Sequence, residues 1–201
     1  MRIHWIKSKP GSICTGLAEV ELEDQDLINQ HGSELKHLHP KKKMEFLASR
    51  QLIREMCEQM NIAFHGIHKD EFGKPYLIDS AYHISISHSY PMVACALHPN
   101  TPCGIDIESA RSQLLKIKHK FLNKEELEFC GEDLNKLCLH WSTKEALYKI
   151  YGRKRLIFAE QLAVLAIGGE EIKAQVTVDR AVENYILNYE YYLEYFIVYN
   201  V

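Results

Sequence analysis

The stretch "HWSTKEALYKIYG" (residues 140–152) predicts a long helix that decides the fold of the second half of the chain. With the residues before it, it gives one apolar stripe at helical spacing: Leu134, Leu137, Cys138, Trp141 and Tyr148. We expect a helix over residues 132–151 that ends at Gly152. Glu145 lies four residues after Trp141, inside this stripe. A carboxylate in such a position must be neutralised, paired or bound to a metal.

A second long helix is expected over residues 40–60, "PKKKMEFLASRQLIREMCEQM". Its apolar residues recur every four positions: Met44, Ala48, Leu52, Met56 and Met60. Pro40 suits the first turn of a helix. A short helix is expected over residues 123–130, with Asn123 as its N-cap and Glu126 three residues later, the spacing of a capping box. The segments that indicate strands are 2–7, 17–22, 83–89, 92–97, 103–108 and several runs after residue 162.

These helices and strands do not alternate regularly, which argues against a doubly wound parallel sheet. We therefore predict an α+β fold with two similar halves, each a long helix packed on a small antiparallel sheet. The break "PNTP" (residues 99–102) divides the chain into an N-terminal half, residues 1–100, and a C-terminal half, residues 101–201.

The composition narrows the class of protein. The chain has 201 residues, 46% of them hydrophobic, which suits one compact domain or two small halves with a shared core. Its net charge of −3 is not the broad basic field that nucleic acid binding usually needs, so we expect no nucleic acid partner. No run reaches the roughly 18 apolar residues of a membrane span, and no signal peptide is evident. We therefore expect a cytoplasmic protein.

The stretch "GIDIE" (residues 104–108) contains a pair of carboxylates on one side of a predicted strand. The Cα atoms of Asp106 and Glu108 would be about 7 Å apart. Two like charges at that separation repel by roughly 2 to 3 kcal/mol at an effective dielectric constant of about 20. A divalent cation would remove this penalty, because hard cations prefer carboxylate oxygens. The alternative is a solvent-exposed strand face that needs no metal.

Two interpretations of Glu145 also stay open. Lys149 follows four residues later, so the two side chains could form an ordinary salt bridge along the helix. In the functional interpretation, Glu145 is a third metal ligand or a general base, and Lys149 is aimed at a nearby anion. Carboxylates and a lysine around one cation suggest phosphate chemistry.

Four motifs in a fixed order make these segments more specific: "FGKPYL", "ISISHS", "CGIDIE" and "WSTKEALYK". With them the sequence resembles the 4′-phosphopantetheinyl transferases, in particular the long pseudo-dimeric type that activates peptide and polyketide synthetases. The family patterns G-[IV]-D-[IVL]-E and W-[ST]-x-K-E-[AS]-x-x-K are matched at residues 104–108 and 141–149. The resemblance extends from about residue 44 to residue 152.

The resemblance implies a cleft between the two halves that binds coenzyme A. Asp106, Glu108 and Glu145 would hold Mg²⁺ against the pyrophosphate of coenzyme A. Lys149 would contact the phosphate under attack. Glu145 is also the candidate base, acting directly or through water.

On the nucleotide side, the resemblance implies that Arg50 and His88 bind the 3′-phosphate of coenzyme A. Lys74 and Pro75 would line the nucleotide, with Ser87 nearby. The family transfers 4′-phosphopantetheine from coenzyme A to a serine of an acidic apo carrier protein and releases adenosine 3′,5′-bisphosphate. A chain with both halves could complete this site as a monomer. The alternatives are a coenzyme A or nucleotide binding module without turnover, and a magnesium phosphoesterase.

Overall fold

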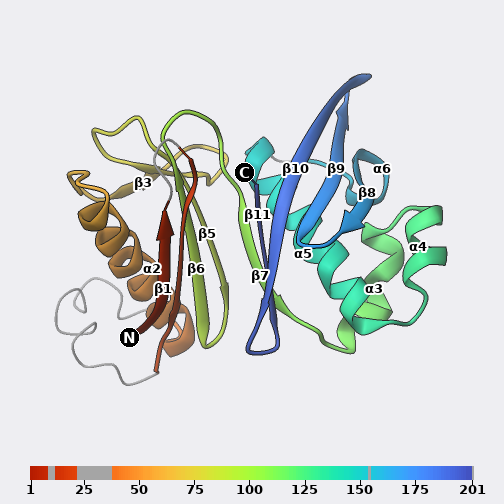
Figure 1. Cartoon of the computed structure of the whole chain (residues 1–201), viewed down its shortest axis with the longest axis horizontal. Helices are drawn as coiled ribbons and strands as arrows, with labels where there is room; N and C mark the ends of the chain where they lie inside the picture. The colour runs from red at the N-terminus through yellow and green to blue at the C-terminus, as the bar shows by residue number, and fades with distance from the viewer. Residues whose placement is uncertain (9–11, 22–37, 154, 201) are drawn as a thin grey trace. The chain divides into compact units, whose positions relative to one another are not determined.

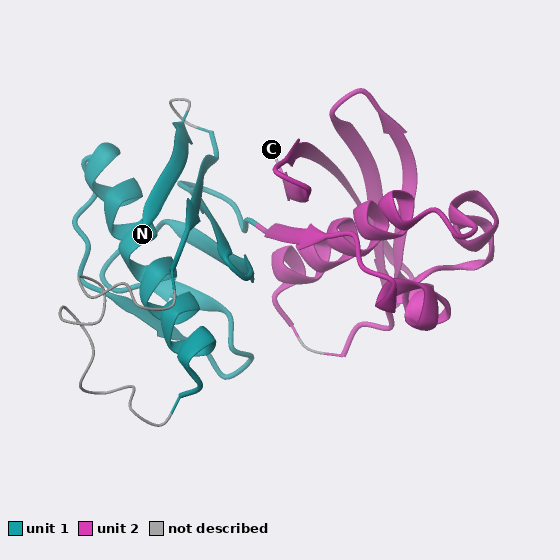
Figure 2. Ribbon diagram, turned by 90° about the horizontal axis from the view of Figure 1, so that it is seen from below, with its two compact units in different colours: residues 1–103 teal, residues 104–201 magenta. Residues whose placement is uncertain are grey.

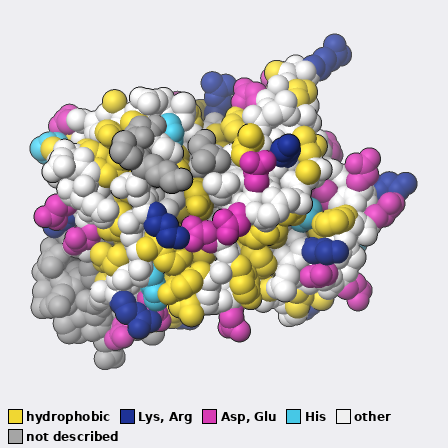
Figure 3. All heavy atoms as spheres, viewed as in Figure 1, with side chains coloured by type: hydrophobic (Ala, Val, Ile, Leu, Met, Phe, Trp, Pro, Cys, Tyr) yellow, Lys and Arg dark blue, Asp and Glu magenta, His cyan; other side chains and the backbone are white. Residues whose placement is uncertain are grey.

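The computed structural model describes residues 1–8, 12–21, 38–153 and 155–200. It divides into two compact units, residues 1–103 and 104–201 (Figure 2). Each unit contains an antiparallel sheet and a long helix (Figure 1), which confirms the predicted α+β class. In the described ranges, no helix is long and apolar enough to cross a membrane. Figure 3 shows acidic and basic side chains interspersed with hydrophobic ones on the visible face.

Unit 1 contains a six-stranded antiparallel sheet and the helix α2 (Pro40–Gln59). Its strand order is β1-β2-β6-β5-β4-β3. The strands are β1 (Arg2–Ser8), β2 (Cys14–Glu19), β3 (Ile67–Lys69), β4 (Pro75–Leu77), β5 (His83–Ser89) and β6 (Met92–His98). Helix α2 packs on β2 and β6, so the core of this unit lies between the helix and the middle of the sheet.

The periodicity of α2 correctly predicted the buried face of this helix. Met44, Ala48, Leu52 and Met56 are all buried, and Pro40 occupies the first turn. Met60, the fifth residue of the predicted face, follows the end of the helix and is only partly buried. The strand expected at residues 17–22 was misplaced, because β2 begins at Cys14 and ends at Glu19. The pairing of β2 with β6 explains the shift, since it already begins with Cys14 opposite Leu97. Residue 22 lies outside the described residues.

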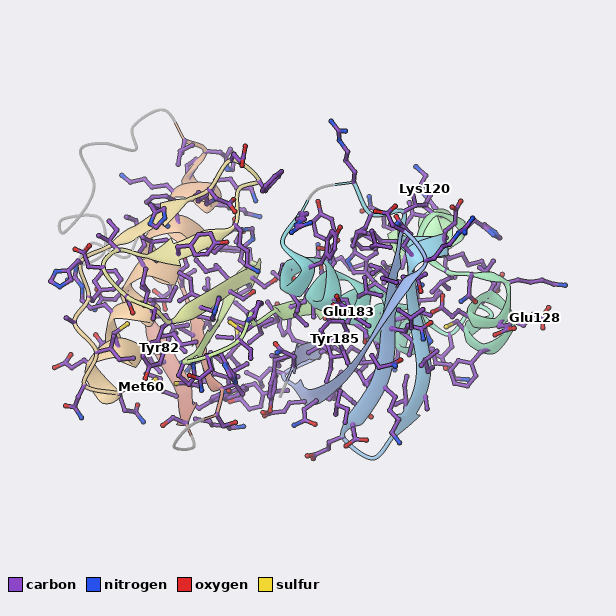
Figure 4. The ribbon with its side chains drawn as sticks, turned by 90° about the horizontal axis from the view of Figure 1, so that it is seen from above. Met60, Tyr82, Lys120, Glu128, Glu183 and Tyr185 are labelled. Atoms are coloured by element: carbon purple, nitrogen blue, oxygen red, sulfur yellow. The ribbon has the colours of Figure 1, made fainter. Side chains whose placement is uncertain are left out.

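Unit 2 contains a five-stranded antiparallel sheet in the order β7-β11-β10-β9-β8. The strands are β7 (Ile105–Ser109), β8 (Leu162–Gly168), β9 (Glu171–Val178), β10 (Ala181–Tyr192) and β11 (Tyr195–Asn200). The helices are α3 (Gln113–Phe121), α4 (Lys124–Cys130), α5 (Leu134–Tyr151) and α6 (Phe158–Gln161). In β10, the Tyr185 hydroxyl donates to Glu183 Oε2 at 2.5 Å, and both residues are labelled in Figure 4.

Helix α5 begins and ends with local signals that the sequence contains. The side chain of Asp133 caps the first turn by accepting from the backbone N–H groups of Asn135 and Lys136. Gly152 follows the last turn with a φ of 69°, the left-handed conformation that glycine adopts at little cost. The predicted ends of this helix, residues 132 and 151, therefore lie close to the observed ones.

The surroundings of α5 differ from the single apolar stripe that the sequence predicted. Ser142, Thr143 and Lys144 are completely buried, although they lie outside that stripe. The cause is packing on several sides, because α5 contacts strands of the sheet as well as α3 and α4. Helix α3 was not predicted from the sequence, so the residues that α5 buries against α3 were expected to be exposed. The short helix α4 has the predicted capping box of Asn123 and Glu126.

Candidate active site

Gly104 brings the strand β7 against the helix α5. A Cβ atom at this position would lie 2.2 Å from the carbonyl oxygen of Ala146 and 3.0 Å from the backbone nitrogen of Ile150. Both atoms belong to the backbone of α5 and cannot turn aside, so only glycine fits. The Gly104 N–H also donates to Asn200 Oδ1 at 2.8 Å. The first residue of the "GIDIE" motif is therefore required by the close approach of strand and helix.

Asp106 follows on β7 and is 3% exposed. Its Oδ1 accepts a hydrogen bond from Lys149 Nζ at 2.8 Å, and the same ammonium donates to the carbonyl oxygen of Ile105 at 2.9 Å. The sequence had left open an ordinary salt bridge between Lys149 and Glu145 along the helix. The structure instead pairs Lys149 with a carboxylate 43 residues away on β7.

Glu108 lies two residues further along β7 and is partly buried. Its Oε1 accepts from the indole N–H of Trp141 at 3.3 Å. Burial and the neighbouring Asp106 raise the pKa of Glu108, while the hydrogen bond from Trp141 opposes that rise. The strand face with Asp106 and Glu108 therefore contacts α5 and is not the solvent-exposed face of the alternative interpretation.

Glu145 on α5 is partly buried, and it is the most perturbed of these carboxylates. Burial raises its pKa from 4.5 to about 7, and the charge of Asp106 adds to this effect. Lys149 lowers the pKa again, but only in part. Negative charge is therefore costly at Glu145, because the charges of both Asp106 and Glu108 add to the effect of burial on its pKa.

The chemistry of this carboxylate set fits a hard divalent cation, because a cation would relieve the repulsion with oxygen ligands. Among the described residues, no group of three or more His, Cys, Asp or Glu side chains is arranged to hold a metal ion. The cation would therefore need ligands from another molecule as well. Mg²⁺ commonly binds in this way, through one or two carboxylates together with the phosphates of a substrate.

Unit 1 carries the residues that the resemblance assigned to the nucleotide. Arg50 lies on α2 with its guanidinium 3.1 Å from the centroid of the Phe46 ring, and its Nη1 donates to the Phe46 carbonyl oxygen at 3.1 Å. Burial lowers the pKa of Arg50 to about 10. Arg50 is thus packed along its own helix.

The strand β5 contains Ser87 and His88. Ser87 is buried, while His88 Nδ1 lies 3.4 Å from Glu45 Oε2. Glu45 is itself buried and also receives a hydrogen bond from Lys42 Nζ at 3.1 Å. This carboxylate beside His88 was not singled out by the sequence analysis, since a Glu on a helix is usually solvated.

Lys74 and Pro75 lie where the chain enters β4. The turn before them is held by Asp70, whose Oδ1 accepts from the backbone N–H of Lys74 at 2.8 Å. Burial lowers the pKa of Lys74, and the charge of Lys74 contributes to lowering the pKa of His83 on β5. Lys74 thus lies near the neighbouring strand β5.

The structure thus brings together Asp106, Glu108, Glu145 and Lys149 within unit 2, whereas the nucleotide-side residues lie on α2, β4 and β5 of unit 1. Trp141 joins the site through Glu108, and Lys144 on the same helix is buried against Glu126; neither residue was predicted in this role. Trp141 had been taken only as part of an apolar stripe, and Lys144 had not been singled out. The sequence contained a sign that Lys144 is buried, because this lysine lies among apolar positions of a predicted helix.

Comparison with known proteins concerns mainly unit 2. Residues 102–189 match the model of the 4'-phosphopantetheinyl transferase superfamily. The matched segment contains all four residues of the carboxylate and lysine cluster, and it covers less than half of the chain. No curated protein matches the chain.

Proposed function

We propose that the chain is a 4′-phosphopantetheinyl transferase of the long, two-halved type. In this proposal it transfers 4′-phosphopantetheine from coenzyme A to a serine hydroxyl of an acidic apo carrier protein, with Mg²⁺, and releases adenosine 3′,5′-bisphosphate. The superfamily match over residues 102–189 supports the reaction class. The observation that carries the proposal is the cluster of Asp106, Glu108 and Glu145 beside Lys149.

Asp106, Glu108 and Glu145 would hold the Mg²⁺ ion together with phosphate oxygens of coenzyme A, which would supply the ligands that the side chains alone do not provide. When bound, the ion stabilises negative charge on the phosphate oxygens. Lys149 Nζ lies 2.8 Å from Asp106 Oδ1, beside one of the carboxylates that would hold the ion, and it would contact the phosphate under attack. In this proposal, Lys149 would supply positive charge where the transition state gains negative charge.

Glu145 would accept the proton of the carrier serine. Without a cation, burial raises the pKa of Glu145 to about 7. A bound cation would favour the ionised form, so the carboxylate could accept a proton at neutral pH. The serine oxygen forms a bond to the β-phosphorus, the bond from that phosphorus to the bridging oxygen breaks, and adenosine 3′,5′-bisphosphate leaves. The proton passes from the serine to Glu145, directly or through water.

In unit 1, Arg50 and His88 would bind the 3′-phosphate of coenzyme A, and Lys74, Pro75 and Ser87 would line the nucleotide. Burial lowers the pKa of Arg50 only to about 10, so it is still a cation at neutral pH. A cation that is partly shielded from water attracts a phosphate more strongly than an exposed one. We also propose that the protein acts as a monomer in the cytoplasm.

The test is mass spectrometry of several apo carrier proteins incubated with the protein, coenzyme A and Mg²⁺. We expect the mass of one phosphopantetheinyl group to be added to a carrier. Glu145→Gln should slow this transfer by about 10²-fold or more, because the acceptor of the serine proton is lost. Glu183→Gln, on an exposed position of β10, is the matched control and should transfer at the wild-type rate.

The proposal fails if the wild-type protein modifies no carrier, or if Glu145→Gln modifies one at the wild-type rate. Tight binding of coenzyme A without any product would indicate a binding module. Hydrolysis of coenzyme A in the absence of a carrier would indicate a phosphoesterase.

A further inference from the structure

Trp141 is enclosed by two aromatic rings, Phe121 and Phe158, which we call the aromatic clamp. The ring centroids of Trp141 and Phe121 are 5.1 Å apart in an edge-to-face arrangement with an interplanar angle of 72°. The ring centroid of Phe158 lies 5.7 Å from that of Trp141, and Phe158 also contacts Tyr148, about two turns further along α5. Contacts of this kind add to the area that each ring buries, so they restrict the indole to one orientation.

The side chain of Lys144 on α5 anchors the backbone of both residues of the aromatic clamp. Lys144 Nζ donates to the carbonyl oxygen of Phe121 at 2.7 Å and to that of Phe158 at 3.3 Å. Its third partner is Glu126 Oε2, at 2.6 Å. Because the Lys144 side chain is 0% exposed, these acceptors have no competition from water. The two phenylalanines, which lie on different sides of the motif in the sequence, are therefore fixed to the same helix as Trp141.

The indole that the clamp holds donates to one of the carboxylates of the site. Trp141 Nε1 lies 3.3 Å from Glu108 Oε1 and is the only hydrogen-bond donor of the indole. The distance is at the long end for such a bond, but the acceptor is a carboxylate, which strengthens it. A rigid donor on one oxygen limits the rotation of the Glu108 carboxylate.

We propose that Trp141 is a positioning residue for Glu108, and that it holds this carboxylate in the orientation in which it binds the divalent cation. The inference rests on the proposed function, since that function supplies the cation. Side chains that orient metal ligands in this way are commonly worth about 10- to 100-fold in metal affinity. The long hydrogen bond places the expected effect of Trp141 near the lower end of that range.

The test compares Mn²⁺ affinity among variants of the full chain, measured by electron paramagnetic resonance with saturating coenzyme A. Trp141→Phe keeps an aromatic ring in the clamp but removes the N–H group. We expect it to bind Mn²⁺ about 10-fold more weakly than the wild type. Trp5→Phe removes the other tryptophan of the chain, in unit 1, and should leave the affinity unchanged.

A second variant separates the hydrogen bond from packing. Incorporation of 3-benzothienylalanine at position 141 replaces the indole N–H by sulfur and nearly preserves the size of the ring. It should weaken Mn²⁺ binding as much as Trp141→Phe does, and it decides the question if Trp141→Phe fails to fold. In transfer assays both variants should need about 10-fold more Mg²⁺ for half-maximal rate, while their rate at saturating Mg²⁺ stays near that of the wild type.

Different results overturn different claims. If the wild type binds Mn²⁺ and the folded variants at position 141 bind it equally well, the role of Trp141 is refuted and the proposed function is untouched. Equal weakening by Trp5→Phe would also refute it, because the effect would then not be local. A wild-type protein that binds no Mn²⁺ would refute both the cation site and the role of Trp141.

Discussion

Replacement of Lys144 by methionine should lower the free energy of unfolding more than the replacement of an exposed lysine does. Methionine fills much of the same volume but donates no hydrogen bond. It would leave Glu126, which is 4% exposed, as a buried carboxylate without its counter-charge. The carbonyl oxygens of Phe121 and Phe158 would also lose a donor. Removal of one partner from a buried ion pair typically costs about 3 to 5 kcal/mol, and we expect a loss of that size.

The assay is urea unfolding of the full chain, followed by tryptophan fluorescence. In a Trp5→Phe background, Trp141 is the only tryptophan, so the signal reports unit 2 alone. Lys144→Met should lower the unfolding midpoint. Lys120→Met, an exposed lysine on α3 that is labelled in Figure 4, is the matched control and should change the free energy of unfolding by less than about 0.5 kcal/mol.

A double-mutant cycle with Glu126→Gln isolates the ion pair. Glutamine is neutral and can still accept hydrogen bonds, so the double variant should be less destabilised than the sum of the two single variants. We expect a coupling free energy of about 2 kcal/mol or more, since both charges are fully shielded from water. The reasoning is refuted if Lys144→Met costs less than about 1 kcal/mol, or if the two substitutions are additive.

Three further predictions test other parts of unit 2. Without divalent cations, wild-type stability should fall as the pH rises from about 4.5 to about 7, because the folded state raises the pKa of Glu145 and so opposes its ionisation. In thermal unfolding, Glu145→Gln should therefore be more stable than the wild type at pH 8, by about 3 kcal/mol. At pH 4 the two proteins should be equally stable. Equal stability at both pH values would contradict the raised pKa. Gly104→Ala should lower the free energy of unfolding in urea by at least about 2 kcal/mol, because its Cβ would meet the backbone of α5 at Ala146. No change would mean that β7 and α5 can separate at little cost. The double substitution Leu193→Asn and Glu194→Gly should raise the melting temperature and add roughly 1 kcal/mol to the free energy of unfolding, since both residues have positive φ in the β10–β11 hairpin. A lower melting temperature would count against backbone strain in this turn.

Local sequence patterns were sufficient to predict most helices and strands. The four-residue spacing of α2, the Asn123 capping box and the stop at Gly152 each depend on residues within one or two turns. The alternation in "GIDIE" likewise placed Asp106 and Glu108 on one side of β7, and the motifs identified the reaction class that the superfamily match supports. The helices α3 and α6 and the strand β3 were missed, and β2 was placed three residues too late.

The sequence by itself determined which side chains are candidates for the chemistry, because residue type and short spacing are local properties. Only the tertiary structure decided what those side chains contact. Lys149 pairs with Asp106 instead of Glu145, Trp141 donates to Glu108, and Lys144 is buried against Glu126. Each of these contacts joins residues 18 to 43 positions apart. Their physical cause is the packing of β7, α3 and α4 around α5, which no periodicity within a single segment encodes.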